Sequence, residues 1–359
     1  RNDKTTTGKA AETLGTAFLV TLVLGFLVGA TLTVLVLIGW LGSYEAQFGW
    51  AFVLALPLAV LVNAFRVLTL EVLRGLHRIA TYNMIAVFVA LTVLFVPLAF
   101  FFAGFRTIHM PWVILATDAV GLVVTGILLF TGPSRISARP PKDRASVGQY
   151  LGLASLYFVS DSSALVSQVD LLVAGAFLPL DDIGHYAVAL RLVALVGLVL
   201  VSANVSFAPK VSGMYQTEGL DAALTLARGQ TRLVVPLSIA MGGAVAILGY
   251  PILLIFGPSF VAAYTTLLIL VAGQIGVVLF GPVGIFLNMT MGHREMAVVT
   301  VLSLVIGLTV SVFLIPTLGI DGAAIANLAA LLTRGITATA FLYLRTGKGI
   351  TIFHAWRAN

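Results

Sequence analysis

Long runs of apolar residues alternate with short polar segments along the whole chain. Most runs reach the roughly 20 residues that an α-helix needs to cross the hydrocarbon core of a bilayer. Backbone groups in lipid must be satisfied within their own segment, so these runs predict helices in a bundle and argue against a barrel. The pattern predicts an all-α, polytopic membrane protein with ten spans, at 18–41, 50–72, 83–104, 112–132, 148–177, 184–208, 232–255, 260–289, 296–316 and 321–344.

Lysine and arginine are unevenly shared between the two sides of these spans. If the N-terminus is cytoplasmic and the spans alternate, fifteen of the twenty Lys and Arg residues lie in cytoplasmic segments and the opposite loops hold only Arg106. Membrane proteins keep positive charge on the cytoplasmic side, and a wrong span count would scramble such an asymmetry. The sequence therefore predicts that both termini are cytoplasmic. The fifteen are Arg1, Lys4, Lys9, Arg74, Arg78, Arg135, Arg139, Lys142, Arg144, Lys210, Arg228, Arg294, Arg345, Lys348 and Arg357.

Composition supports the membrane assignment and disfavours several other classes. Of 359 residues, 60% are hydrophobic and only 9% are charged, too few charges for the surface of a soluble domain. The net charge of +6 comes from residues scattered over many loops, which favours anionic lipid headgroups over nucleic acid as the partner. The chain has no cysteine, and its five histidines lack ligand spacing, so we expect no metal and no cofactor. Because no nucleophile and base are suitably placed, we expect no enzyme activity.

The longest polar connection, SRISARPPKDRAS, lies near the middle and reads as a linker between two bundles. It divides the chain into an N-terminal lobe of four spans (1–133), a cytoplasmic linker (134–147), a C-terminal lobe of six spans (148–345) and a cytoplasmic tail (346–359). A weak repeat relates the lobes, since RGLHR at 74–78 and MGHRE at 291–295 each precede a similar pair of spans, offset by about 216 residues. The imbalance of four spans against six predicts that two helices are missing from the N-terminus.

Some residues in the spans suit close packing or kinking of helices. Gly25 and Gly29 have the spacing that lets two helices approach closely in lipid. Prolines within or at the edges of spans remove a backbone hydrogen bond and can kink a helix, whether for static packing or for a hinge. These prolines are Pro57, Pro97, Pro236, Pro251 and Pro282.

Ionisable side chains inside a bilayer are costly and usually face a partner or a wet cavity. The span at 148–177 is the most polar, and its segment SDSSALVSQVD (160–170) places a wide polar face on a helix. That face is expected to line a cavity or to contact neighbouring helices. The ionisable residues within spans are Arg66, Asp118, Asp161, Asp170, Arg191 and Arg334.

The roles of these residues stay open at this point. Arg191 either pairs with Asp170 on the preceding antiparallel helix or binds an anionic substrate, and the two roles are compatible. Arg66 lies close enough to the cytoplasmic side to extend into the headgroups, although it shares a stripe with Asn63 and Arg74 that suits a path for phosphates. Arg334 lies near mid-membrane.

Two of the carboxylates are candidates for ion coupling. Asp118 and Asp161 are expected to act as protonated carriers if transport is coupled, because burial raises carboxylate pKa values.

Three segments resemble bacterial oligosaccharide flippases of the Wzx type. VDLLVAGAFLPLDDIGHYAVALRLVALVGLVLVSANVSFAPKVS (169–212) resembles their seventh and eighth helices, with an acidic residue, a Gly-x-Tyr, an Arg-Leu and a late Pro. YPILLIFGPSFVAAYTTLLILVAGQ (250–274) is similar to their ninth-to-tenth helix junction, and IPTLGIDGAAIANLAA (315–330) to the start of the twelfth helix. The resemblance covers 148–345 well and the first half loosely.

The resemblance implies the multidrug/oligosaccharidyl-lipid/polysaccharide (MOP) exporter fold, like that of MATE transporters. It implies two lobes around a central cavity that opens alternately to each side of the bacterial cytoplasmic (inner) membrane. In such flippases a cationic cavity holds the diphosphate and sugars of an undecaprenyl-linked repeat unit, while the lipid tail stays in the bilayer. Arg191 and Arg334 match that role best, with Arg66 and Asp170 as further candidates.

The favoured hypothesis is therefore a flippase of lipid-linked oligosaccharides for O-antigen, capsule or exopolysaccharide synthesis. Its partners would be the lipid-linked oligosaccharide, membrane lipid, and polysaccharide polymerase and glycosyltransferases. The main alternative is a cation-coupled multidrug exporter of the same superfamily that uses Asp118 or Asp161 as an ion site. A non-transporting membrane scaffold would instead have all its buried charges paired.

Overall fold

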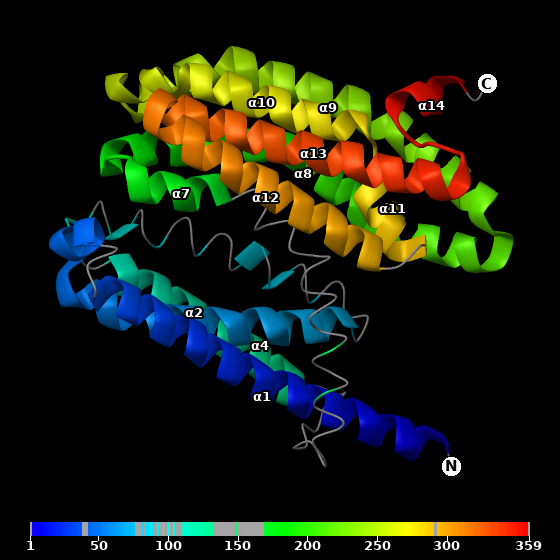
Figure 1. Ribbon diagram of the computed structural model, residues 1–359. Helices are drawn as coiled ribbons and strands as arrows, with labels where there is room; N and C mark the ends of the chain where they lie inside the picture. Colours follow the sequence, from blue (N-terminus) through cyan, green and yellow to red (C-terminus); the bar gives the residue numbers. More distant parts are fainter. Residues whose placement is uncertain are drawn as a thin grey trace. The chain divides into compact units, whose positions relative to one another are not determined.

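The computed structural model describes residues 2–37, 42–75, 110–131, 169–290 and 293–357, together with isolated positions between 76 and 168 (Figure 1). The described residues form helices and connecting turns without any strand. The chain divides into two compact units, unit 1 over 1–152 and unit 2 over 153–359. We describe each unit by itself.

Unit 1 contains helices α1 (Asn2–Leu37), α2 (Gly42–Gly75) and α4 (Met110–Thr131). Helix α2 packs against both α1 and α4. The close approach predicted for Gly25 and Gly29 is confirmed, because a Cβ atom on Gly25 would lie 2.8 Å from Leu61 Cδ1 and one on Gly29 would lie 3.0 Å from Pro57 Cβ. The missing side chains of these two glycines therefore let α1 lie directly on α2.

Unit 2 is a bundle in which long helices lie side by side (Figure 1). Helices α8 and α9 pack along each other, as do α12 and α13, and α10 contacts α8, α9 and α13. Its elements are α7 (Val169–Phe177), α8 (Leu180–Glu218), α9 (Leu220–Phe256), the 3₁₀ helix η2 (Pro258–Ala263), α10 (Tyr264–Leu279), α11 (Val283–Thr290), α12 (His293–Leu318), α13 (Ile320–Thr346) and α14 (Ile352–Arg357).

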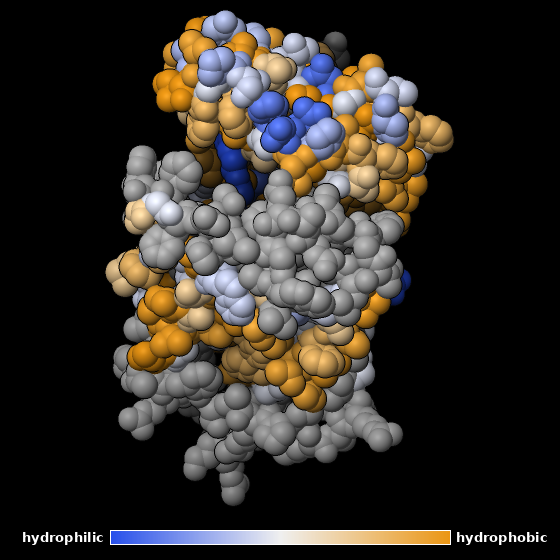
Figure 2. Space-filling model, turned by 90° about the vertical axis from the view of Figure 1, so that its left-hand side faces the viewer, coloured by the Kyte–Doolittle hydropathy of each residue, from blue (hydrophilic) through white to orange (hydrophobic). Residues whose placement is uncertain are grey.

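Within the described residues, six helices are long and apolar enough to cross a bilayer. Large apolar side chains point outward from them, such as Ile247 at 75% exposed and Phe313 at 71%. Apolar side chains also cover much of the described surface seen in Figure 2. An apolar outer surface is what contact with lipid requires, so the helices support a multi-pass membrane protein. Much of the predicted span at 83–104, including Pro97, and most of 148–168 lie outside the described residues.

Three helices extend beyond the apolar runs that predicted their spans. Helix α1 begins at Asn2 rather than near 18, α8 extends to Glu218 rather than 208, and α9 begins at Leu220 rather than 232. Apolar runs show where a helix can contact lipid, whereas the helix itself continues through polar residues that also favour helical backbone. Lys210 and Arg228 consequently lie on helices and not in a loop.

The predicted single span at 260–289 is interrupted. Helix α10 ends at Leu279, and α11 begins at Val283. Gly281 has a left-handed φ of 73°, and Pro282 lacks a backbone N–H, so neither residue favours continuation of the helix. The break places irregular backbone next to the cleft described below.

The C-terminal segment is tied to α9 and to this break. The Thr231 hydroxyl donates to the Ile350 carbonyl at 2.9 Å, and Arg228 Nε donates to the Gly349 carbonyl at 3.0 Å. Arg232, at the first position of the predicted span 232–255, donates from Nε to the Ala355 carbonyl at 2.6 Å. Residues 346–359 thus include a helix, α14, that packs on α9.

Candidate functional site

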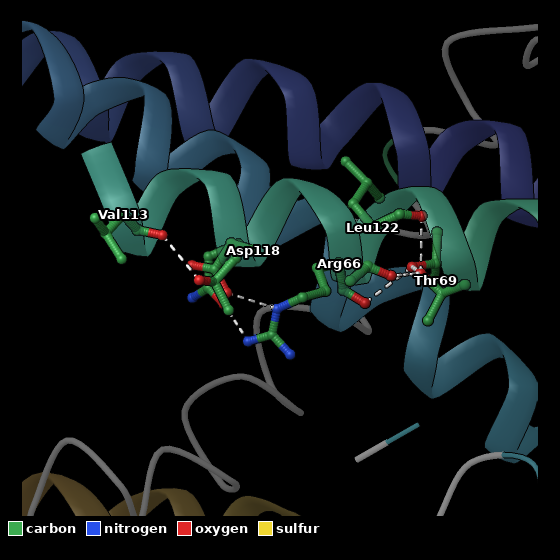
Figure 3. Close-up of polar contacts among 9 residues, drawn as sticks. Arg66, Thr69, Val113, Asp118 and Leu122 are labelled. Atoms are coloured by element: carbon green, nitrogen blue, oxygen red, sulfur yellow. Dashed lines mark hydrogen bonds and ion pairs between the residues drawn. The ribbon is translucent and has the colours of Figure 1, made fainter. Parts of the chain in front are cut away.

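In unit 1, α2 and α4 bring a cation and an anion together. Arg66 Nε lies 3.0 Å from Asp118 Oδ1, and the two side chains are 17% and 11% exposed (Figure 3). Arg66 Nε makes no aligned hydrogen bond to a described residue, so this contact is an ion pair without a directional bond. Arg66 therefore reaches a carboxylate on a neighbouring helix, where we had expected it to extend into the headgroups.

The same two helices share polar contacts beside this pair. A second Arg66 nitrogen, Nη2, donates to Asn63 Oδ1 at 2.6 Å. Thr69 and Thr125 are buried, and their hydroxyls lie 2.9 Å apart across the α2–α4 interface (Figure 3). Because the Thr69–Thr125 contact and the Arg66–Asp118 ion pair both join α2 to α4, they indicate that Arg66 and Asp118 belong to the packing of unit 1.

In unit 2, the carboxylate of Asp170 lies at the meeting point of three helices. Asp170 begins α7 and is fully buried. Its Oδ2 accepts hydrogen bonds from the Tyr186 hydroxyl on α8 and, at 3.2 Å, from Asn327 Nδ2 on α13. Asp170 Oδ1 has no hydrogen-bond partner among the described residues.

The pairing of Asp170 with Arg191 is absent from the described residues, whose ion pairs do not include it. Tyr186 and Arg191 are five residues apart on α8, so they project about 140° apart around the helix. Tyr186 points to Asp170, and Arg191 lines a cleft instead. Neutral donors bind one oxygen of the carboxylate, Oδ2, and the charge of Arg191 is directed elsewhere.

Arg191 and Arg334 line two adjoining clefts of unit 2. The Arg191 cleft has a volume of about 250 Å³ and also exposes Asn327 and Gln274. The Arg334 cleft has a volume of about 330 Å³ and also exposes Asn204 and Gln274. Both clefts share Gly197, Gln274 and Leu331, so together they form one surface over α8, α10 and α13, which we name the arginine cleft.

The charged side chains that are described in the lining of the arginine cleft are all positive. Within the part of the chain that the structure describes, the lining includes two arginines and three amides, and no aspartate or glutamate. Arginine presents a planar fork of donors that fits phosphate oxygens, and amides donate to phosphates and to sugar hydroxyls. The lining therefore suits an anionic or hydroxyl-rich molecule and disfavours a cation.

Small residues shape the arginine cleft. A Cβ atom on Gly197 would lie 2.9 Å from Gln274 Nε2, so α8 passes close to that amide because position 197 is glycine. A Cβ atom on Gly284 would lie 3.7 Å from Arg334 Nη2, which places the guanidinium beside the start of α11. The backbone at Gly281 and Pro282 also lines this end of the cleft.

Sequence reasoning singled out both arginines but missed Gln274 and Asn327. Each is an isolated amide within a long apolar run. An amide in such a run needs a polar partner in the membrane, and this is the signal in the sequence that could have identified both residues. Asp161, the other ion-coupling candidate, lies outside the described residues. Within the part of the chain that the structure describes, no three His, Cys, Asp or Glu side chains are grouped so as to hold a metal.

No protein-family model matches the chain, and no curated protein matches it. Among solved structures, it is similar to the inward-facing conformation of a multidrug resistance MATE family transporter of the MOP superfamily, with a TM-score of 0.69 and 13% identity over 97% of this chain and 88% of that one. It is also similar to the lipid II flippase MurJ in its inward closed conformation, with a TM-score of 0.67 and 12% identity over 93% and 73% of the two chains. A MOP superfamily transporter from Pyrococcus furiosus matches with a TM-score of 0.62 and 14% identity over 94% and 80%.

The chain has the fold of the MOP superfamily transporters. At 12–14% identity the likeness concerns the fold, which is what the resemblance to oligosaccharide flippases had implied. The MOP-fold neighbours are transporters with different substrates, since one is a lipid II flippase and another a multidrug resistance transporter. The substrate of this MOP-fold chain must therefore be argued from its own cleft.

Proposed function

We propose that this protein moves a lipid-linked oligosaccharide across the bacterial cytoplasmic membrane by alternating access, without covalent chemistry. The observation that carries the proposal is the arginine cleft, whose described lining contains Arg191, Arg334 and three amides, and no carboxylate. In this proposal the arginines bind the diphosphate that joins sugars to a polyprenyl chain, and the amides bind sugar hydroxyls. Glycosyltransferases would supply the substrate, and a polysaccharide polymerase would use it after transport.

The cleft charge separates this proposal from multidrug export. A cationic drug would be repelled by two arginines, and the buried carboxylate Asp118 is already paired with Arg66. In the Pyrococcus furiosus neighbour, too, the reverse polarity of the binding pocket suggests a different function. Arg191 is exposed and makes no ion pair with any described residue, which leaves its charge available to a ligand.

Binding of a polyprenyl diphosphate to the purified protein tests this function. We expect Arg191→Ala and Arg334→Ala each to weaken binding at least about tenfold, the effect of losing one charge-assisted hydrogen bond. Arg→Lys at either site keeps the charge but loses the fork, so its effect should be smaller. Arg345→Ala is the matched control, because Arg345 pairs with Glu295 outside the cleft.

The opposite result would favour the multidrug alternative. If a cationic aromatic drug binds more tightly than the diphosphate, and neither arginine variant weakens the diphosphate, the flippase proposal is wrong. Complementation of a flippase-null strain that makes the cognate sugar unit then tests transport itself. Wild type should restore surface polysaccharide, whereas Arg191→Ala should fail to do so at equal expression.

We also propose that both termini are cytoplasmic, as the charge asymmetry favours. The natural absence of cysteine makes this straightforward to test, because each introduced cysteine is the only thiol. A cysteine at Ser137 should react with an impermeant thiol reagent only after the cells are opened, and one at Gly104 should react in intact cells. The reverse pattern would invert the orientation.

A further inference from the structure

The segment 347–357, which we name the C-terminal strap, is fastened along one face of α9. Three side chains of α9, at positions i, i+3 and i+4, each donate a hydrogen bond to a backbone carbonyl of the strap. The donors are Arg228, Thr231 and Arg232, and the acceptors are Gly349, Ile350 and Ala355. Ile350 and Ala355 are fully buried, so the strap is part of the packed bundle.

Two side chains of the strap pack on the two sides of the break between α10 and α11. Ile350 belongs to the core cluster that contains Val283 and Phe286, in the first turn of α11. Ile352 packs against the cluster that contains Val278, in the last turn of α10. Because the strap contacts both the helix that ends and the helix that begins, it spans the break.

The backbone of the strap also approaches the break directly. A Cβ atom at Gly281 would lie 3.0 Å from the Ile350 carbonyl oxygen and closer still to Thr231 Oγ1. Position 281 therefore lies against the hydrogen bond between Thr231 and Ile350 that fastens the strap to α9. Helix α9, the strap and the break meet at this one point.

The same break forms a wall of the arginine cleft beside Arg334. A Cβ atom at Gly284 would lie 3.7 Å from Arg334 Nη2, and one at Gly335 would overlap the ring of Phe280. The path of the break thus determines what lies next to the Arg334 guanidinium. Arg191 lines the other part of the cleft, whose described lining comes from α7, α8, α10 and α13.

We propose that the C-terminal strap is a positioning element of the arginine cleft and that it acts through Arg334. Its hydrogen bonds to α9 hold the break in the path that places the start of α11 beside the guanidinium. Thr231 and Arg228 thereby affect ligand affinity, although neither is among the described lining residues. The inference rests on the proposed function, because ligand binding in the cleft is its readout.

Thr231→Val tests the proposal, because valine keeps the shape of threonine and removes the hydroxyl. The probe is undecaprenyl diphosphate, titrated against the purified full chain. We expect Thr231→Val to weaken binding by about fivefold, the factor that corresponds to one neutral hydrogen bond. Thr231→Ser keeps the hydroxyl and should restore wild-type affinity. Wild-type affinity in Thr231→Val, or equal losses in the valine and serine variants, would overturn the positioning role.

Ser303→Ala is the matched control. The Thr231 hydroxyl also lies 3.0 Å from the Ala227 carbonyl, so Thr231→Val removes a bond within α9 as well as the bond to the strap. Ser303 is likewise fully buried, and its hydroxyl donates to the Val299 carbonyl of its own helix at 2.7 Å. Ser303→Ala should bind the probe as wild type does. A loss equal to that of Thr231→Val would make the effect a general one and refute the role of the strap.

A double-mutant cycle separates positioning of Arg334 from a general effect on the bundle. Once Arg334 is replaced by alanine, Thr231→Val should weaken binding little further. In the Arg191→Ala background it should still weaken binding by about fivefold. Equal further losses in both backgrounds would rule out action through Arg334. If Arg191→Ala and Arg334→Ala both bind the probe normally, the proposed function itself fails, and the role of the strap fails with it.

A second variant covers the case in which Thr231→Val does not fold. Arg228→Ala removes the hydrogen bond to the Gly349 carbonyl, and Arg345→Ala controls for the loss of one positive charge. Arg228→Ala should weaken binding by a few fold relative to Arg345→Ala, and only while Arg334 is present. Equal affinities in Arg228→Ala and Arg345→Ala would contradict the positioning role.

Discussion

Arg66 in unit 1 and Arg191 in unit 2 are both arginines inside apolar helices, yet their surroundings differ. Arg66 lies 3.0 Å from the carboxylate of Asp118 on the neighbouring helix. Arg191 lines a cleft, and the nearby carboxylate of Asp170 is bound by Tyr186 and Asn327 instead. The same residue type thus neutralises a charge in one unit and presents a charge in the other.

The difference shows how a membrane bundle can keep a cationic site. A buried carboxylate can be held by neutral donors and need not be held by an arginine. In unit 2 the Tyr186 hydroxyl and the Asn327 amide bind Asp170 Oδ2, and the amide of Asn327 lies both against Asp170 and in the arginine cleft. Asp170 is therefore better described as positioning Asn327 than as contacting substrate.

Breaking the pair in unit 1 should give the largest effect on stability. Arg66→Ala or Asp118→Ala leaves one partly buried charge without its partner, which costs about 3 kcal/mol. The double variant removes both charges and should recover part of that loss. Thermal unfolding of the purified protein measures all three, and additive losses would show that the two residues do not interact.

Changing Asp170 should separate stability from binding. Asp170→Ala leaves two buried donors without their acceptor and should cost about 2 kcal/mol. Asp170→Asn keeps an acceptor for Tyr186 and should cost less. Because Asp170 does not line the cleft, neither variant should weaken diphosphate binding as Arg191→Ala does.

Titration with the same polyprenyl diphosphate checks this expectation. A loss of binding in Asp170→Asn as large as that in Arg191→Ala would instead give the carboxylate a direct role toward the substrate.

Gly197→Ala should have the smallest effect and should act on the cleft. The added methyl displaces only the end of the Gln274 side chain, while alanine favours helix over glycine by about 1 kcal/mol. Stability should therefore hold or rise slightly as diphosphate affinity falls by a few fold. Gly184→Ala on the same helix, where no atom lies within 4 Å, controls for the helix effect, and equal affinities in both variants would remove Gln274 from the site.

Much of the fold could be predicted from local pattern. The apolar runs at 296–316 and 321–344 match α12 (His293–Leu318) and α13 (Ile320–Thr346) to within a few residues. The run at 260–289 predicts one span but forms two helices, α10 and α11. The break is not visible in the hydropathy, because the residues on both sides of Gly281 and Pro282 are equally apolar. Hydropathy reports contact with lipid and is insensitive to a left-handed residue within a run.

The sequence by itself determined the class of protein, because transfer of apolar residues into lipid depends on composition and run length alone. It also determined which charged residues were candidates for the functional site, because an ionisable side chain within an apolar run is costly to place in a bilayer. Only the tertiary structure decided which partner each charge has. Arg66 pairs with Asp118, which is 52 residues away in the sequence. Asp170 accepts a hydrogen bond from Asn327, which is 157 residues away, and Arg191 lines the cleft. Such partners depend on how the helices are rotated and packed, and no local pattern encodes that rotation.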